Sequence, residues 1–189
     1  MKTTATKSYQ KTSSKSFLIS FSALAEYGFL LLIGMLAVTI HAKMRIPLKL
    51  PGHHGIEFIA LLMAGRVVTK NEWAARISTL GAGVLLLTPF LSFKDPFMSL
   101  IILVPGIAID ILYNNLSRFK KNYIFAGLVG GFSYMLIPIA RLIISFVTGF
   151  PYESLLMGAL YPILTHFIFG MSGAIIAYSA ISGVKKLIK

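Results

Sequence analysis

The stretch FLISFSALAEYGFLLLIGMLAVTIHA, residues 17–42, decides the fold class of this chain. A helix needs about 20 predominantly apolar residues to cross the hydrocarbon core of a bilayer, and this stretch exceeds that length. It is also too long for the hydrophobic region of a signal peptide, and no small-x-small cleavage site follows it. We therefore expect an uncleaved membrane helix. Residues 1–16, which are polar and rich in lysine, are expected to form a flexible basic cytoplasmic tail ahead of it.

The rest of the chain continues the pattern of long apolar blocks. Hydrophobic residues make up 56% of the sequence and charged residues only 13%, whereas soluble domains average about 45–50% and about 25%. Helix breakers and charges outline five further spans, at residues 54–68, 76–93, 96–114, 123–148 and 153–184. The sequence therefore predicts an all-α polytopic membrane protein, in which residues 17–189 form one integral membrane domain of six helices.

The formal charge of +12 is placed in short loops and tails beside the apolar blocks. Such charges set topology and meet anionic lipid, so nucleic acid is not an expected partner. With the N-terminus inside, the outer loops hold only Lys43, Arg45, Lys49 and Lys94. The inner loops and tails then hold Lys2, Lys7, Lys11, Lys15, Arg66, Lys70, Arg76, Arg118, Lys120, Lys121, Lys185, Lys186 and Lys189. The positive-inside rule thus predicts cytoplasmic termini in a plasma membrane, with a prokaryotic inner membrane as the expected setting.

The first outer loop and the short span after it, KMRIPLKLPGHHGIEFIALLMAGR at residues 43–66, carry polar groups that topology does not explain. Arg45, Lys49, His53, His54 and Glu57 are therefore candidates for contact with a solute, the alternative being side chains solvated at the interface. Imidazole and carboxylate also suit zinc. However, helix breakers flank the two histidines, and the H-E-x-x-H spacing of zinc proteases is missing, so no metal site is predicted.

Three ionisable side chains lie inside predicted spans: Asp110, Arg141 and His166. Each costs at least about 2.5–3.5 kcal/mol at the centre of a bilayer, so each is a functional candidate. A rise of 1.5 Å per residue places Asp110 and His166 at one depth, roughly 20 Å below the outer surface. We expect them to form a polar pair. Its alternatives are a purely structural hydrogen bond between helices and an aspartate hydrated near the inner interface.

Arg141 is expected about 10 Å nearer the outer surface by the same rise, and there it needs an anion. Glu57 and Glu153 are the candidates within the chain. An acidic solute is another, because a guanidinium binds a carboxylate bidentately, and an upward snorkel is the structural alternative. Phe150, Tyr152 and Tyr161 are candidates to line an outward pocket and stack on a flat ligand, the alternative being aromatic anchoring at the membrane interface. The predicted solute-binding residues are Arg45, Lys49, His53, His54, Glu57, Arg141, Tyr152, Glu153 and His166. No catalytic residue or cofactor is predicted.

In size and organisation the chain resembles the S components of energy-coupling factor transporters, which are small membrane proteins that bind vitamins. IPLKLPGHHGIEFIALLMAGR, residues 46–66, is similar to their first outer loop and short second span. LYPILTHFIFGMSGAIIAY, residues 160–178, is similar to their glycine-rich last span. The resemblance implies uptake of a vitamin-like solute, with the first loop as a lid. It also implies a membrane coupling subunit and two ATPases as partners, since the chain lacks the P-loop motif G-x-x-x-x-G-K-[ST].

Three functions are compatible with these residues. A substrate-binding transport subunit for a small, anionic, vitamin-like solute accounts for the cationic outer loop and Arg141, and it is not an enzyme. A membrane-embedded metal-dependent enzyme would use His53, His54 and Glu57, or Asp110 with His166 as an acid–base pair. A structural or assembly subunit would use the glycine-rich helix faces, such as Gly127 and Gly131.

Overall fold

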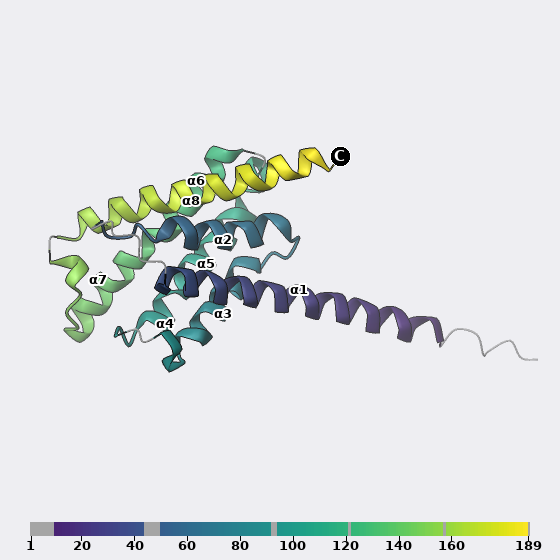
Figure 1. Ribbon diagram of the computed structural model, residues 1–189, viewed down its shortest axis with the longest axis horizontal. Helices are drawn as coiled ribbons and strands as arrows, with labels where there is room; N and C mark the ends of the chain where they lie inside the picture. Colours follow the sequence, from purple (N-terminus) through teal and green to yellow (C-terminus); the bar gives the residue numbers. More distant parts are fainter. Residues whose placement is uncertain (1–9, 44–49, 92–93, 121, 157, 189) are drawn as a thin grey trace, which may run out of the picture.

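The computed structural model describes residues 10–43, 50–91, 94–120, 122–156 and 158–188. Within these ranges every regular element is a helix, which confirms the all-α prediction (Figure 1). In chain order the α-helices are α1 (Gln10–Lys43), α2 (Gly55–Val68), α3 (Ala74–Leu86), α4 (Met98–Ile101), α5 (Leu103–Asn115), α6 (Tyr123–Tyr134), α7 (Leu136–Thr148) and α8 (Leu160–Leu187). Three short 3-10 helices join them: η1 (Pro89–Leu91), η2 (Ser117–Phe119) and η3 (Glu153–Leu155).

Among the described residues, four helical stretches are long and apolar enough to cross a membrane: Phe21–Lys43, Met98–Asn115, Tyr123–Thr148 and Leu160–Leu187. The two remaining helices, α2 with 14 residues and α3 with 13, extend only about 20 Å at 1.5 Å per residue. That is short of a hydrocarbon core of about 30 Å. The predicted membrane character is therefore supported by four stretches, and six crossings remain a prediction.

Two of the predicted spans are each divided into two helices, and a proline explains both divisions. Proline lacks an N–H, and its ring clashes with the carbonyl group four residues earlier. Pro105 is four residues after Ile101, where α4 ends, and Pro138 is four residues after Tyr134, where α6 ends. The break between α6 and α7 matters for the site, because it positions Arg141 on α7 separately from Tyr134 on α6.

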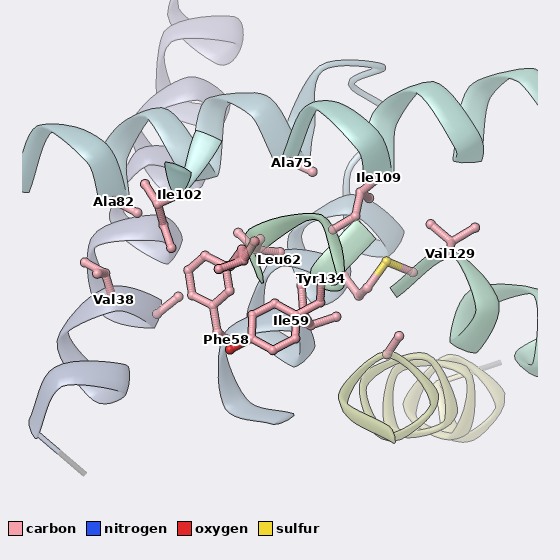
Figure 2. Packing of buried hydrophobic residues seen from close by; sticks show 14 of the residues in the cluster. Val38, Phe58, Ile59, Leu62, Ala75, Ala82, Ile102, Ile109, Val129 and Tyr134 are labelled. Atoms are coloured by element: carbon pink, nitrogen blue, oxygen red, sulfur yellow. The ribbon is translucent and has the colours of Figure 1, made fainter. Parts of the chain in front are cut away.

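The core is built around α2, whose side chains Phe58, Ile59, Leu62 and Met63 are fully buried. Figure 2 shows Phe58, Ile59 and Leu62 among apolar side chains of the surrounding helices, such as Val38 of α1 and Ile109 of α5. Small residues bring the helices close together, as the glycine pattern predicted. A Cβ atom added at Gly81 of α3 would lie 2.3 Å from the backbone oxygen of Leu31 in α1. The glycine therefore permits direct contact between the two backbones.

The outer surface of the bundle is apolar, as expected for a protein surrounded by lipid. Leu24 of α1 is 68% exposed, Phe146 of α7 is 91% exposed and Ile168 of α8 is 58% exposed. Large apolar side chains exposed on several helices at once exceed what monomeric soluble proteins show. The exposed side chains therefore support the same membrane environment as the helix lengths.

Polar residues lie at both ends of the bundle: one end holds Arg66, Asp110 and Lys185, and the other holds His54 and Arg141. The start of α1 and the end of α8 lie at one end (Figure 1). There the Lys185 ammonium donates to the Val67 carbonyl oxygen at 3.1 Å, and Arg66 pairs with Asp110. The opposite end holds His54 and Arg141. The fold thus gathers several basic residues that the positive-inside rule assigned to one side, while the direction of the bundle in a membrane remains a prediction.

Candidate functional site

A cavity of about 150 Å³ lies at the end of the bundle that holds Arg141. Helices α1, α4, α6, α7 and α8 contribute to its wall, together with the connection before α2 and the short helix η3. Its lining consists of His41, Pro51, Gly52, His54, Met98, Tyr134, Ile137, Arg141, Ser154 and His166. Three of the predicted solute-binding residues, His54, Arg141 and His166, are therefore brought together in one cavity.

Two glycines of the PGHHG segment shape one wall of the cavity. Gly52 has a φ of +81°, a conformation that favours glycine, and its carbonyl oxygen accepts from the Gly55 amide at 2.8 Å. A Cβ atom at Gly52 would lie 2.5 Å from Nδ1 of His166, and one at Gly55 would lie 2.0 Å from Cε1 of Tyr134. Both glycines are required because the segment passes directly over these two rings.

Tyr134 and His166 form a rigid aromatic wall. Their rings are stacked, with centroids 4.8 Å apart and planes 29° apart. Nδ1 of His166 lies 2.7 Å from the Pro162 carbonyl oxygen. Because a carbonyl oxygen only accepts, Nδ1 carries the proton, and Nε2 remains as the other hydrogen-bonding atom. Tyr134 is 2% and His166 4% exposed, so both rings are held by packing.

The other imidazoles form a second aromatic group. The ring of His54 is 5.0 Å from that of His41 and 3.8 Å from that of His53, measured between centroids. Nδ1 of His54 lies 3.0 Å from the Glu57 carboxylate, and Nδ1 of His53 lies 2.6 Å from the Leu50 carbonyl oxygen. His54 therefore lines the cavity, and its ring is held by the Glu57 carboxylate and by contact with the ring of His53.

Arg141 projects into the cavity with few strong partners. Its Nη2 atom is 3.8 Å from Oδ2 of Asp95, which is within ion-pair range but too long for a hydrogen bond, and 3.5 Å from the sulfur of Met98. Its Nε atom is buried and makes no hydrogen bond to any described residue. Since a guanidinium has five N–H donors, Arg141 retains donors for a further anion.

Asp95 is held in place by groups other than Arg141. Its Oδ1 atom accepts from the Phe97 amide at 2.9 Å and from the Tyr152 hydroxyl at 3.3 Å. Burial, and then the Asp95 carboxylate beside it, raise the pKa of Tyr152 to about 12, so the hydroxyl remains a donor at neutral pH. Tyr152 also places its ring 5.5 Å from the guanidinium of Arg141. Asp95 and Tyr152 thus support Arg141 from outside the cavity lining.

The partner expected for Arg141 was wrong. Glu57 pairs with His54, and Glu153 is exposed, whereas Asp95 provides the carboxylate nearest to the guanidinium. Asp95 fell between the predicted spans 76–93 and 96–114 and was not selected. Its position directly before Pro96 was the available signal, because an aspartate in a turn accepts from the backbone amide two residues later, here that of Phe97.

The predicted pair of Asp110 and His166 was also wrong. Helix α8 begins at Leu160, so His166 is only about 9 Å along it at 1.5 Å per residue, near the end that holds Arg141. Asp110 instead accepts from the backbone amides of Ala75 at 3.2 Å and Arg76 at 2.9 Å. The depth estimate failed because it started the last span at Glu153, where the structure has the separate helix η3.

Asp110 belongs to a second polar cluster near the basic end of the bundle. The carboxylate is fully buried and lies 3.3 Å from Nε of Arg66 and 3.8 Å from Nε of Arg76. Arg66 is 4% exposed, donates to the Asn114 side chain and packs its guanidinium on the ring of Tyr113. Sequence reasoning placed Arg66 in a loop and missed this burial. The Nε atoms of Arg66 and Arg76 are, like that of Arg141, buried without a hydrogen bond to any described residue. Both guanidiniums nevertheless pair with the Asp110 carboxylate, and the cluster joins α2, α3 and α5 outside the Arg141 cavity, so we assign it to structure.

The remaining predicted residues lie elsewhere. Arg45 and Lys49 fall outside the described residues. Phe150 and Tyr152 pack on each other with centroids 4.9 Å apart, and Tyr161 is 41% exposed, so these rings do not line the cavity. Tyr134, which sequence reasoning did not select, supplies the aromatic wall instead. Within the described ranges, no group of three or more histidine, aspartate or glutamate side chains is placed to hold a metal ion.

Comparisons with protein families, with curated proteins and with solved structures found no match to this chain. The function is therefore argued from the cavity itself. The arrangement presents one guanidinium, three imidazoles and a tyrosine around a space large enough for a small molecule. Such a set recognises an anion and stacks on a ring, and a few polar groups converging on a pocket are typical of binding sites.

Proposed function

We propose that this protein is the substrate-specific membrane subunit of an uptake system for a small, vitamin-like anionic solute. The observation that carries the proposal is the cavity at the Arg141 end, where the buried Nε–H of the guanidinium has no hydrogen-bond partner among the described residues and the nearest carboxylate, of Asp95, is 3.8 Å from Nη2. A buried cation without a tight partner is costly unless a ligand or another charge compensates it. A solute carboxylate would supply that compensation in bidentate geometry.

The energy for uptake is proposed to come from other subunits. The sequence has no G-x-x-x-x-G-K-[ST] motif for holding nucleotide phosphates. We propose a membrane coupling subunit and ATPase subunits as partners, in line with the resemblance to S components of energy-coupling factor transporters. Affinity purification of the tagged chain from mildly solubilised membranes tests this part, since an ATPase should be recovered with it.

Native mass spectrometry of the purified full-length chain tests the binding function. We expect wild-type protein to carry a small acidic molecule and Arg141→Gln to lack it. Arg118→Gln, which removes an exposed arginine of η2 next to α5, is the matched control and should retain the molecule. Ligand-free wild-type protein, or an Arg141→Gln variant that still holds the same molecule, would contradict the proposal.

A membrane-embedded enzyme is the second candidate, and the contact between His54 and Glu57 supports it. An imidazole at 3.0 Å from a carboxylate is the arrangement of a general base with its orienting group. A stoichiometric metal in the purified protein, or turnover of a bound solute that His54→Gln abolishes, would favour this candidate over transport.

A further inference from the structure

We infer that the solute is a single-ring aromatic monocarboxylate. This inference rests on the proposed function and adds the chemical class of the ligand. It follows from three properties of the cavity that are independent of one another: its volume, the nature of its walls and the balance of charge around Arg141.

The volume limits the ligand to about one ring. The cavity measures about 150 Å³, and a cavity of about this volume inside a protein takes up a benzene molecule. Most drug-sized ligands occupy pockets of about 300–1,000 Å³. The second ring of a fused two-ring compound would therefore have to extend out of the cavity or displace the stacked rings of Tyr134 and His166, which are almost fully buried.

The walls favour a flat aromatic ligand over an aliphatic one. Tyr134 and His166 present a stacked pair, and His41 and His54 present two further rings whose centroids lie 5.0 Å apart. Met98 adds a polarizable sulfur, which makes favourable contacts with aromatic rings. Aromatic pairs gain about 0.5–1.5 kcal/mol beyond the area they bury, whereas a saturated ring gains only from the area.

The charge balance favours a single negative charge. Arg141 is the only arginine or lysine among the described lining residues, and no described lining residue is acidic. The guanidinium already shares part of its charge with Asp95 at 3.8 Å. Because Asp95 already compensates part of the charge of Arg141, a ligand with one negative charge is more compatible with the cavity than a dianion such as a phosphate monoester, which would bury a second negative charge without a cation.

Equilibrium dialysis of the purified full-length chain with radiolabelled benzoate tests the inference. Four competitors each differ from benzoate in one property. Benzamide lacks the charge and cyclohexanecarboxylate lacks the aromatic ring. Phenyl phosphate carries an additional charge, and 2-naphthoate has an additional ring. We expect benzoate to bind at least about tenfold more tightly than benzamide, which loses a charge-assisted hydrogen bond, and about two- to tenfold more tightly than cyclohexanecarboxylate, which loses aromatic pairing. Phenyl phosphate and 2-naphthoate should also bind more weakly than benzoate, because the first buries an additional charge and the second exceeds the cavity volume. A competitor that binds as tightly as benzoate would overturn the corresponding part of the inference.

Two variants connect this selectivity to Arg141. Arg141→Gln should abolish the preference for benzoate over benzamide, whereas Arg118→Gln should retain it. Asp95→Asn keeps the oxygen that accepts from Phe97 and Tyr152 but removes the competing charge, so benzoate should bind about threefold or more tightly. If Asp95→Asn leaves benzoate affinity unchanged or weaker in a folded protein, the carboxylate does not bind at Arg141.

The inference and the proposed function fail in different ways. A solute of another class, found by native mass spectrometry and lost in Arg141→Gln, would overturn the inference and leave the proposed function standing. Protein that holds no solute and binds neither benzoate nor any competitor would remove both.

Discussion

Gly55 shows how a single missing side chain shapes the candidate site. Its backbone lies against Tyr134, which in turn stacks on His166. The segment PGHHG therefore does more than connect two helices: its glycines let the chain pass over the rings of Tyr134 and His166, and its second histidine, His54, lines the cavity. This double use explains why polar residues and glycines occur together at residues 51–55.

Replacing Gly55 by alanine should disturb the aromatic wall. The added Cβ would lie 2.0 Å from the Tyr134 ring, so the ring has to move and its stacking on His166 is lost. We expect benzoate affinity to fall at least about tenfold and stability to fall by about 1–3 kcal/mol, as for other overpacked sites.

The control for this variant is Gly183→Ala in α8, where no atom lies within 4 Å of the added Cβ. It should bind benzoate normally, with a stability gain of up to about 1 kcal/mol from helix propensity. Dialysis and thermal unfolding in detergent measure both effects. Normal binding by Gly55→Ala would show that the Tyr134 wall is not part of the site.

Tyr152→Phe should change stability in a pH-dependent way. Burial and the Asp95 carboxylate raise the pKa of Tyr152 from 10 to about 12 in the folded protein. The protonated phenol therefore stabilises the fold below pH 10, and this contribution is lost as the pH rises from 10 to about 12. At neutral pH the variant should lose about 0.5–1.5 kcal/mol, the value of one hydrogen bond.

Thermal unfolding at pH 9 and pH 11 tests this expectation. The difference in stability between wild type and Tyr152→Phe should shrink at the higher pH. Tyr161→Phe, at an exposed ring, is the control and should show no such change. An unchanged difference between the two pH values would indicate that the Tyr152 hydroxyl does not interact with Asp95.

The three predicted solute-binding residues that line the cavity were selected from the sequence for two different reasons. Arg141 and His166 were selected because an ionisable side chain inside an apolar span is costly, and His54 because its polar loop opposed the charge asymmetry. Asp95 and Arg66 were missed because each sits at the edge of an apolar block, where a solvated position is equally compatible with the sequence. Only the packing of α2, α5 and α7 brings them to their partners.

Helices α2, α3 and α5 are joined by one carboxylate. Asp110 of α5 accepts from the first turn of α3 and pairs with Arg66 at the end of α2. An anion at a helix N-terminus also interacts favourably with the helix dipole. Because α2 and α3 are too short to cross the hydrocarbon core alone, this link is expected to fix both helices in the bundle.

Asp110→Asn should therefore destabilise the protein strongly. The change leaves Arg66, which is 4% exposed, without its counter-charge. Breaking a buried ion pair from one side typically costs about 3–5 kcal/mol. Unfolding followed by circular dichroism in detergent should show this loss, whereas Glu72→Gln, an exposed carboxylate next to α3, should stay within about 0.5 kcal/mol of wild type.

The double variant Asp110→Asn with Arg66→Met completes this test. Replacing a buried ion pair by neutral groups is often close to neutral, so the double variant should regain much of the loss. If the single Asp110→Asn change proves as harmless as Glu72→Gln, the cluster does not hold the three helices together.

Among the helices, the existence of each segment was predictable and its exact extent was not. Apolar blocks indicated every membrane segment, but one span was expected to run unbroken through residues 123–148. The division at Met135 was foreseeable from Pro138 alone. The separate helix η3 was not, because GFPYESLL has no signal that excludes an early start of the last span. That error moved His166 to the wrong depth and produced the wrong pair.

The assembled protein places its cavity and its basic cluster at opposite ends of an apolar bundle. The positive-inside rule directs the basic end to the cytoplasm. With that orientation, which remains a prediction, we expect the cavity to open to the outside, as the proposed uptake function requires. The predicted orientation of the bundle distinguishes uptake from a function on the cytosolic side. The prediction depends on the distribution of basic residues and not on a contact within the fold.

Cysteine labelling in intact cells tests this account most directly, because the chain has no native cysteine. Ser154, which lines the cavity, is replaced by cysteine, and Asn115, exposed at the end of α5, is replaced in a second variant. With a membrane-impermeant maleimide, we expect Ser154→Cys to react in intact cells and Asn115→Cys to react only after permeabilisation. The reverse pattern would place the cavity in the cytosol and contradict uptake from outside.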